Sequence, residues 1–373
     1  MTKNRLGGLS FDPFLRRHWQ KKPLLARAAL PQCAGLVKRD QLFALAARDD
    51  IESRLVLRSG RRWDVRHGPF TARELGRLPA TGWTLLVQGI DRVLPAASEL
   101  LQRFTFLPHA RLDDVMASYA PPGGGVGPHF DSYDVFLLQV QGVRRWRVSR
   151  QRDLSLAEGA PLRILRRFRA SAEWFLHPGD MLYLPPRYAH EGTAVSECVT
   201  CSIGFRAPQA QELGTRFLEF LQEELHLEGI YRDPGLRRPR HPALLDDVMT
   251  GKLKRMLGRI RWSAGDVERF LGCYLTEPKP NVVFSRPRRP AAPAVFARRA
   301  ARGGVRLALP TRMLFRHGAF FINGESCAAH PRAGRTLRQL ADHRLLPPAT
   351  AIDRESAHWL YRWYRAGYLE LGA

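Results

Sequence analysis

The sequence has few cysteines, a shortage of acidic residues and no long apolar run. Its five cysteines are an odd number scattered along 373 residues, which excludes a disulfide framework. No apolar stretch approaches the roughly 20 residues that span a bilayer. The first residues lack the apolar core of a signal peptide, because Asp12 and the Arg16-Arg17 pair interrupt it. We therefore expect a cytoplasmic protein that does not enter a membrane.

Cys198 and Cys201 have the spacing of a redox or zinc-binding pair. No second cysteine pair and no suitably spaced histidine accompanies them, and they lie in an apparent strand. We therefore expect two reduced cysteines in a hydrophobic core.

Basic side chains outnumber acidic ones by 59 to 35, which gives a net charge of +24. Residues 101–210 carry 13 basic and 10 acidic side chains, whereas residues 1–100 carry 18 and 9 and residues 211–373 carry 28 and 16. Most of the excess positive charge therefore lies in residues 1–100 and 211–373, which we call the basic flanks. Basic flanks favour a polyanion such as RNA. The alternative is that an Arg- and Ala-rich composition reflects genomic base bias.

Hydrophobic spacing divides the chain into parts of different structure. Strand signals dominate from about residue 110 to 206, and residues 212–227 and 244–271 have apolar side chains at helical spacing. Residues 278–293 are rich in Pro and Arg and indicate a linker. Residues 305–322 suggest strands that end in a hairpin turn at Asn323-Gly324, and residues 357–369 are amphipathic. A chain of this length and pattern predicts two or three domains of the α+β class.

Two histidines and one aspartate form a candidate metal site. His129 and Asp131 are two apart at the edge of an expected strand, so their side chains should point the same way. His190 follows a turn and another strand. Two imidazoles and one carboxylate that leave open positions are typical of non-haem Fe(II) oxygenases. A His-x-Asp pair often arises by chance, but its strand–turn–strand surroundings favour a metal in the mouth of a small barrel.

Arg144 is a candidate anion-binding residue. In the strand that begins there it shares its face with Trp146 and Val148, the apolar side. A guanidinium on that face needs a partner, because burying an unpaired charge is costly. A carboxylate that accepts two hydrogen bonds is its best partner, either on a bound molecule or on an internal Asp or Glu.

Asp114, Met116 and Ser118 alternate along the expected strand 112–120 and should share one face. Tyr133 has the strand parity of His129 and Asp131. From the residues alone, a turn or surface position explains Asp114 better than a site does.

The chain resembles the JmjC-type 2-oxoglutarate oxygenases, and among them the bacterial ribosomal oxygenases that hydroxylate an arginine of a large-subunit ribosomal protein. The resemblance is most specific in the first 210 residues or so. It is carried by Trp19-Gln20-Lys21-Lys22-Pro23-Leu24-Leu25, Ser118-Tyr119-Ala120, the run from Gly123 to Asp134, Arg144-Arg145-Trp146-Arg147-Val148, Pro178-Gly179-Asp180 and Gly204-Phe205-Arg206-Ala207-Pro208.

The resemblance implies a fold and a division into domains. Residues 1–207 would form a double-stranded β-helix, the jelly-roll barrel of cupins and JmjC proteins. Residues 208–283 would form a helical dimerisation region, and residues 284–373 a winged-helix-like domain that binds DNA or serves structure and protein contacts. The protein would be a homodimer.

The resemblance also implies an activity. Fe(II) would be held by His129, Asp131 and His190 and would act with 2-oxoglutarate and dioxygen. Arg144 and Ser118 would bind 2-oxoglutarate, and the substrate arginine would be held by Asp114, Met116, Tyr133 and Ser202. The substrate would be the sixteenth large-subunit protein, hydroxylated at an arginine β-carbon. Relatives often have an asparagine where this chain has Thr200, which puts one cosubstrate contact in doubt.

Two other functions stay open. The same chemistry could act on a lysine or a tRNA base, although a pocket containing Asp114 argues against that. A barrel without activity could bind RNA or ribosomes through its basic flanks. A basic enzyme would also repel a basic ribosomal protein at long range, so either local acidic groups or a bridging RNA would have to bring them together.

Overall fold

The computed structural model describes residues 5–60, 62–328 and 333–372. The chain forms two compact units, of which the first comprises Met1–Ala207, Pro278–Arg312 and His330–Ala373. The second comprises Pro208–Glu277 and Met313–Ala329. The three consecutive domains expected from the sequence (1–207, 208–283 and 284–373) stay a prediction.

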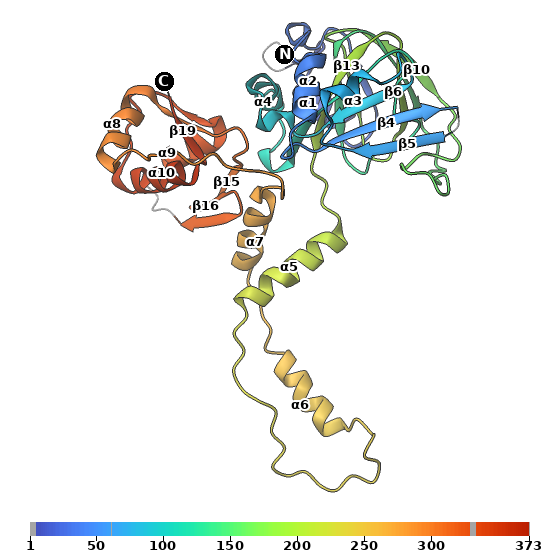
Figure 1. Cartoon of the computed structure of the whole chain (residues 1–373). Helices are drawn as coiled ribbons and strands as arrows, with labels where there is room; N and C mark the ends of the chain where they lie inside the picture. Colours follow the sequence, from blue (N-terminus) through green and yellow to red (C-terminus); the bar gives the residue numbers. More distant parts are fainter. Residues whose placement is uncertain (1–4, 61, 329–332, 373) are drawn as a thin grey trace. The chain divides into compact units, whose positions relative to one another are not determined.

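An antiparallel sheet of eight strands forms one wall of a barrel in the first unit (Figure 1). In spatial order its strands are β3 (Leu24–Ala26), β11 (Met181–Leu184), β8 (Val135–Gln141), β13 (Cys198–Phe205), β7 (Leu112–Ala120), β6 (Trp83–Val87), β4 (Ser53–Ser59) and β5 (Arg62–His67). A smaller sheet of three strands has the order β10 (Ala172–Leu176), β9 (Arg144–Ser149) and β12 (Ala189–Ala194). The strands expected at 112–120, 144–148 and 181–184 are therefore present.

Strand β8 shows how the sequence divides its side chains between two cores. Val135 and Leu137 pack in one buried cluster with Trp146 of β9, which joins the two sheets. Phe136 and Leu138 point the other way into a larger cluster. Because successive strand residues face opposite sides, a nearly continuous apolar run fills both cores, as expected for a strand buried on both faces.

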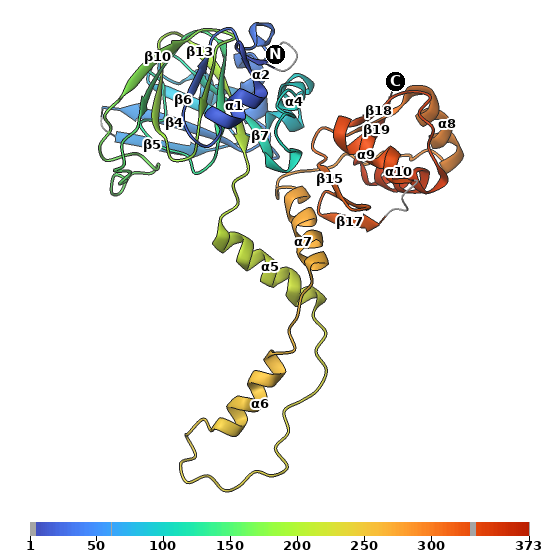
Figure 2. The same cartoon turned by 180° about the vertical axis from the view of Figure 1, so that it is seen from behind.

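Helices cover the outer face of the large sheet (Figures 1 and 2). They are α1 (Phe11–Arg17), α2 (Arg39–Ala46), α3 (Ala72–Gly76) and α4 (Pro95–Gln102). Phe14 of α1, Leu42 of α2 and Leu100 of α4 are fully buried in the same cluster as Phe136. Cys198 and Cys201 of β13 are buried and unpaired, as predicted.

The second unit consists of α5 (Ala210–Glu224), α6 (Asp247–Leu257), α7 (Ala264–Thr276) and the strands β15 (Met313–Arg316), β16 (Ala319–Ile322) and β17 (Glu325–Ala328). The helical spacing predicted for 212–227 and 244–271 is confirmed, but the second stretch is divided between two helices. Asn323 and Gly324 both have positive φ, 48° and 87°, as a tight β16–β17 hairpin requires. The predicted hairpin is therefore present.

The remainder of the first unit consists of α8 (Pro293–Gly303), β14 (Val305–Leu307), α9 (Ala333–His343), β18 (Leu345–Leu346), α10 (Arg354–Ala366) and β19 (Leu369–Leu371). Its three strands form a sheet in the order β18-β14-β19. The segment before α8 has no helix or strand, in agreement with the predicted linker. Among the described residues, none of the helices combines the length and apolar character needed to cross a bilayer.

Candidate metal centre

The three predicted ligands come from two separate segments. His190 lies in β12, whereas His129 and Asp131 lie in the segment that joins β7 to β8. His129 forms an isolated β-bridge to His190, but Asp131 lies outside any strand. The strand-edge position expected for this pair is therefore correct only at His129, and the loop itself positions Asp131.

Main-chain hydrogen bonds fix the two histidines against each other. The amide of His129 donates to the carbonyl of His190 at 2.9 Å, and the amide of His190 donates back at 2.8 Å. The loop beyond is held by the amide of Arg187, which donates to the carbonyl of Asp131 at 2.7 Å. These bonds fix the main chain from which all three side chains project.

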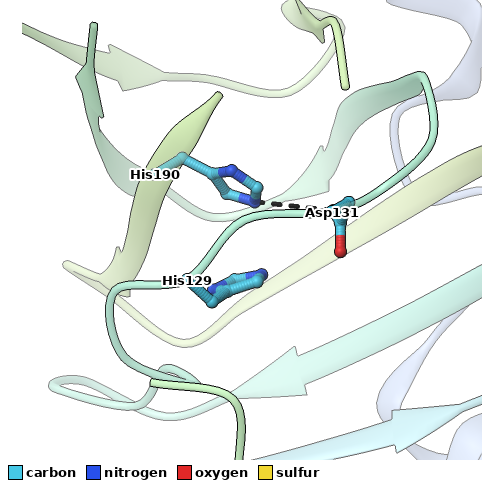
Figure 3. Close-up of side chains that lie close together, drawn as sticks. All are labelled: His129, Asp131 and His190. Atoms are coloured by element: carbon cyan, nitrogen blue, oxygen red, sulfur yellow. Dashed lines mark ion pairs between the residues drawn. The ribbon is translucent and has the colours of Figure 1, made fainter. Parts of the chain in front are cut away.

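The three side chains converge (Figure 3). Each offers one ligand atom, and these atoms all lie within 4.8 Å of one another. His190 Nε2 is 3.7 Å from Asp131 Oδ2, and the imidazole centroids are 4.3 Å apart. Atoms at this spacing can be drawn onto one metal ion with bonds of about 2 Å by small side-chain movements.

Hydrogen bonds orient both imidazoles for metal binding. Nδ1 of His129 is 2.9 Å from the carbonyl of Gly127, and Nδ1 of His190 is 2.8 Å from the carbonyl of Tyr188. A carbonyl can only accept, so Nδ1 carries the proton and Nε2 keeps its lone pair. Burial, with a smaller effect of His129, lowers the pKa of His190 to about 4. Its ring is therefore neutral near pH 7, as a metal ligand must be.

The glycine run before His129 allows the loop to pass close to its neighbours. A Cβ on Gly125 would lie 2.4 Å from the carbonyl oxygen of Gly192 in β12. Gly127 has a φ of +78°, and a Cβ there would lie 2.7 Å from the ring of Trp63. Larger residues would push His129 away from His190, so these glycines are needed for the site's geometry.

All nine residues predicted for the site line one cavity of about 460 Å³. They are Asp114, Met116, Ser118, His129, Asp131, Tyr133, Arg144, His190 and Ser202. Their convergence is a finding, whereas the role of each stays a prediction.

Arg144 occupies one end of this cavity with most of its donors unused. It is 4% exposed, and its Nη1 donates to Ser118 Oγ at 3.2 Å. Its Nε and Nη2 have no hydrogen-bond partner, nor does Nε1 of the neighbouring Trp146. Within the part of the chain that is described, Arg144 makes no ion pair with a carboxylate. A buried guanidinium in this state matches a bound carboxylate better than an internal salt bridge.

Thr200 lies beside this end of the cavity. It is paired with Ser118 across β13 and β7, and its hydroxyl donates to Oε1 of Gln139 at 2.8 Å. The hydroxyl is thus engaged with another buried side chain.

Asp114 lies in another part of the cavity and is held by several donors. It is 3% exposed, and Nε2 of Gln88 lies 3.0 Å from its Oδ1 and 2.9 Å from its Oδ2. Nη2 of Arg92 and Nζ of Lys279 also donate to Oδ2, at 3.3 and 3.0 Å. Oδ1 accepts from Gln88 but from neither cation, and a Cβ built on Gly204 would lie 3.8 Å from it. Because Gly204 lines the cavity, we infer that Oδ1 is the oxygen available to a ligand.

Sequence reasoning missed the residues that hold Asp114. Gln88 follows the buried strand β6, and Arg92 lies in a short 3-10 helix, Ile90–Arg92. Lys279 is 165 positions from Asp114 in the chain, and its Nζ also lies 3.3 Å from Oδ1 of Asp113. No local pattern marks any of them, because such contacts depend on the tertiary fold.

Comparison with known protein families agrees with this description. Residues 99–213 match the JmjC domain, and residues 259–370 match the ROXA-like winged helix. The ribosomal protein uL16 3-hydroxylase of Escherichia coli K12 is 34% identical over 322 residues, which cover 85% of each chain. A probable ribosomal oxygenase of Haemophilus influenzae is 40% identical over 205 residues, 54% of this chain and 50% of that protein.

Solved structures extend the likeness to the whole chain. The structure of YcfD, a ribosomal oxygenase from Escherichia coli, in complex with cobalt and 2-oxoglutarate superposes with a TM-score of 0.84 at 30% identity. It covers 98% of this chain and 99% of that one. An X-ray structure of the same protein gives a TM-score of 0.85 at 30% identity, covering 97% and 98%. The predicted α+β fold, with a JmjC barrel and a winged-helix-like C-terminal part, is confirmed.

Proposed function

The chain belongs to the JmjC-domain ribosomal oxygenases, and from that membership we propose that it hydroxylates the β-carbon of an arginine in a large-subunit ribosomal protein. It is a 2-oxoglutarate-dependent oxygenase that uses Fe(II) and dioxygen. The uL16 3-hydroxylase among its relatives supports the sixteenth protein of the large subunit as the substrate.

One observation carries this proposal. A single cavity holds two imidazoles beside a carboxylate, a buried guanidinium with unused donors, and a second carboxylate that is buried and lines the cavity. These three features suit a metal ion, an anionic cosubstrate and a cationic substrate. A barrel that only binds RNA would have no use for such a combination.

Each group in the cavity has a separate task. His129, Asp131 and His190 would hold Fe(II) and leave positions open to other ligands. When bound, iron, 2-oxoglutarate and dioxygen supply the oxidising chemistry, in which one oxygen atom enters a C–H bond and the other ends in succinate as carbon dioxide is released. Arg144, with Ser118 beside it, would anchor the far carboxylate of 2-oxoglutarate through two parallel hydrogen bonds.

The substrate side of the cavity would orient an arginine. Oδ1 of Asp114 would accept from the guanidinium, while Met116 and Tyr133 would contact the aliphatic part and Ser202 would add a polar contact. Holding both ends of the side chain fixes which carbon faces the metal, and this positioning is the protein's main contribution to the rate.

The test is an assay with purified protein, Fe(II), 2-oxoglutarate and arginine-containing peptides from large-subunit ribosomal proteins. Mass spectrometry should find one added oxygen on an arginine, with one succinate formed per product. Modification of a lysine or of tRNA would point to the same chemistry on another target. Failure to turn over any peptide, together with tight RNA binding, would favour a binding protein instead.

We also propose that the enzyme is a homodimer, formed through the helical region 208–283. In α5 only Leu221 is buried, and α6 has no buried residue. Large apolar side chains are exposed on or near these helices, among them Leu218, Leu244, Leu245, Val248 and Leu257. An exposed apolar surface of this kind marks a protein contact. Size-exclusion chromatography with light scattering should give twice the chain mass.

A ribosomal substrate supports the proposal that the enzyme works in the cytoplasm, beside ribosomal RNA. The basic flanks would then contact RNA through its phosphates. The winged-helix-like part would either bind RNA as well or serve protein contacts. Removing its positive charges and measuring RNA affinity would distinguish these two roles.

A further inference from the structure

The segment between β9 and β10 concentrates the barrel's positive charge. Residues 150–169 contain six arginines and two acidic residues, whereas the rest of 101–210 contains seven basic and eight acidic residues. This single segment therefore carries the whole net charge of the barrel. We call its six arginines the arginine rim: Arg150, Arg152, Arg163, Arg166, Arg167 and Arg169.

The charges of the arginine rim are not neutralised within the chain. All six side chains are exposed, and within the described residues none of them forms an ion pair with a carboxylate. Arg163 instead lies over the ring of Phe130, 5.3 Å from its centroid. Six unpaired guanidinium groups on one short segment form a surface that attracts anions.

The main chain of this segment is fixed by hydrogen bonds. Gln151 organises it, because its Nε2 donates to the carbonyls of Asp153 and Arg167 at 2.6 and 2.9 Å. Its Oε1 accepts from the amide of Arg169 at 3.1 Å. Ile164 and Leu165 are buried. The main chain of such a segment loses little conformational entropy when it binds a partner.

The segment that carries the arginine rim lines part of the catalytic cavity, and Arg163 is the rim residue among the lining residues. Residues 161–164 line that cavity together with His129 and His190. The amide of Leu165 donates to the carbonyl of Pro128, directly before His129, at 2.8 Å. The cavity therefore has a buried acid, Asp114, within it and a strongly basic border outside.

This arrangement has opposite effects on two kinds of ligand. The acid inside selects a cationic side chain, but the basic border repels a free polypeptide rich in Lys and Arg. A polyanion that travels with such a polypeptide removes the repulsion. Guanidinium groups bind phosphates in bidentate fashion, and exposed Arg and aromatic groups also stack on bases.

We propose that the arginine rim binds RNA at the entrance of the active site, so that the enzyme takes its substrate as a protein already bound to RNA. The second part of this statement depends on the proposed function, whereas RNA binding by the rim does not. The rim is distinct from the basic flanks, since it lies in the otherwise balanced barrel.

The experiment measures RNA binding by the full-length protein in the absence of turnover. Fluorescence anisotropy with a labelled RNA hairpin and a labelled single strand, at several salt concentrations, gives the affinity and its salt dependence. The test variant replaces Arg152, Arg166, Arg167 and Arg169 by Gln. The matched control replaces Arg237, Arg238, Arg240 and Lys254 by Gln, which removes the same charge from exposed positions in the second unit.

We expect the rim variant to lose at least about tenfold in RNA affinity near physiological salt, and the control to lose much less. For single-stranded RNA, the slope of log affinity against log salt concentration is negative. Its magnitude should decrease by roughly 0.7 for each phosphate that the variant no longer neutralises. The melting temperature should be unchanged in the rim variant, because its four substituted side chains are exposed and lie outside the cavity. The kcat/KM of a short peptide rich in Lys and Arg should stay the same or rise, because the variant repels such a peptide less.

Three outcomes would overturn the proposal. Equal losses of RNA affinity in the two variants would mean that RNA binding depends only on the total charge of the protein. An unchanged affinity in the rim variant would place RNA binding elsewhere. Binding of an acidic polypeptide such as polyglutamate, without RNA binding, would assign the rim to a protein partner. Because none of these measurements uses hydroxylation, they stand whether or not the peptide assay supports the proposed function.

Discussion

Nζ of Lys279 lies 3.0 Å from Oδ2 of Asp114, although 165 positions separate the two residues in the chain. Arg92 approaches the same oxygen, while Oδ1 is left to Gln88 and the cavity. The linker that follows α7 therefore reaches the residue proposed to bind the substrate. Two cations on one oxygen would fix the carboxylate and aim the other oxygen at a ligand.

Replacing Lys279 by Ala is expected to raise the peptide KM several-fold while kcat and the KM for 2-oxoglutarate stay the same. Lys279→Arg should restore the peptide KM, because it keeps a cation near Oδ2. Lys254→Ala, on the exposed surface of α6, is the matched control. A peptide KM that falls in Lys279→Ala would show that the lysine competes with the substrate instead of positioning Asp114.

Replacing Arg144 by Met should remove cosubstrate binding without harming the fold. A buried guanidinium with unused donors is costly, so the variant should melt at the same or a higher temperature when no cosubstrate is present. With a divalent metal present throughout, added 2-oxoglutarate should raise the melting temperature of the natural protein but not of Arg144→Met. Thermal unfolding with and without 2-oxoglutarate measures both effects. An equal increase in the melting temperature of both proteins on adding 2-oxoglutarate would show that Arg144 has a structural role instead.

Replacing Asp131 by Ala should abolish succinate formation and the stabilisation that a metal provides. For the natural protein, metal at 100 times its Kd should add about 2.7 kcal/mol to the free energy of unfolding, and a chelator should remove it. Asp153→Ala is the control, since Asp153 is exposed and outside the cavity. Retained succinate formation in Asp131→Ala would refute the proposed ligand set.

Asp91 provides a test of pH dependence. Burial, reinforced by the charge of Asp114, raises the pKa of Asp91 to about 6 in the folded protein, above its ordinary value of about 3.9 in an unfolded chain. The folded state therefore binds the proton more tightly, and stability is lost as pH rises from about 4 through 6. Above this pH range Asp91 is charged in both the folded and the unfolded protein. The folded protein is then destabilised by the full cost of burying the charged carboxylate.

Asp91→Asn should raise the free energy of unfolding at pH 8 by on the order of 2 kcal/mol, because an amide is neutral and its oxygen can still accept from the amide of Val115. This increase in the free energy of unfolding should become smaller as pH falls from 6 to 4. Denaturant titrations at these pH values measure the free energy of unfolding, and Asp40→Asn, at an exposed position, is the control. A gain that is independent of pH would exclude the titration of Asp91 as its cause.

The sequence allows most of the site to be predicted, for reasons visible in particular residues. Asp114, Met116 and Ser118 alternate along β7, and Arg144 lies on the apolar face of β9, so period-two alternation brings all four to one cavity. The resemblance to a family supplied their roles. Asp131 departs from the strand geometry because Gly127 and the turns after it shape a loop, and the spacing of two residues does not distinguish a loop from a strand.

Contacts between distant parts of the chain could not be predicted. Lys279, Arg92 and Gln88 meet Asp114 only after the chain has folded, and an ion pair has no periodic signal. The break between α6 and α7 was missed although a local signal exists, since Ser263 and Asp266 form a capping box at the start of α7.

The reciprocal main-chain bonds between His129 and His190 have a consequence for substitutions at the metal site. They join the amide and carbonyl groups of the two residues, so replacing either imidazole by another side chain leaves both bonds available. At these two positions, loss of a metal ligand can therefore be separated from loss of the barrel.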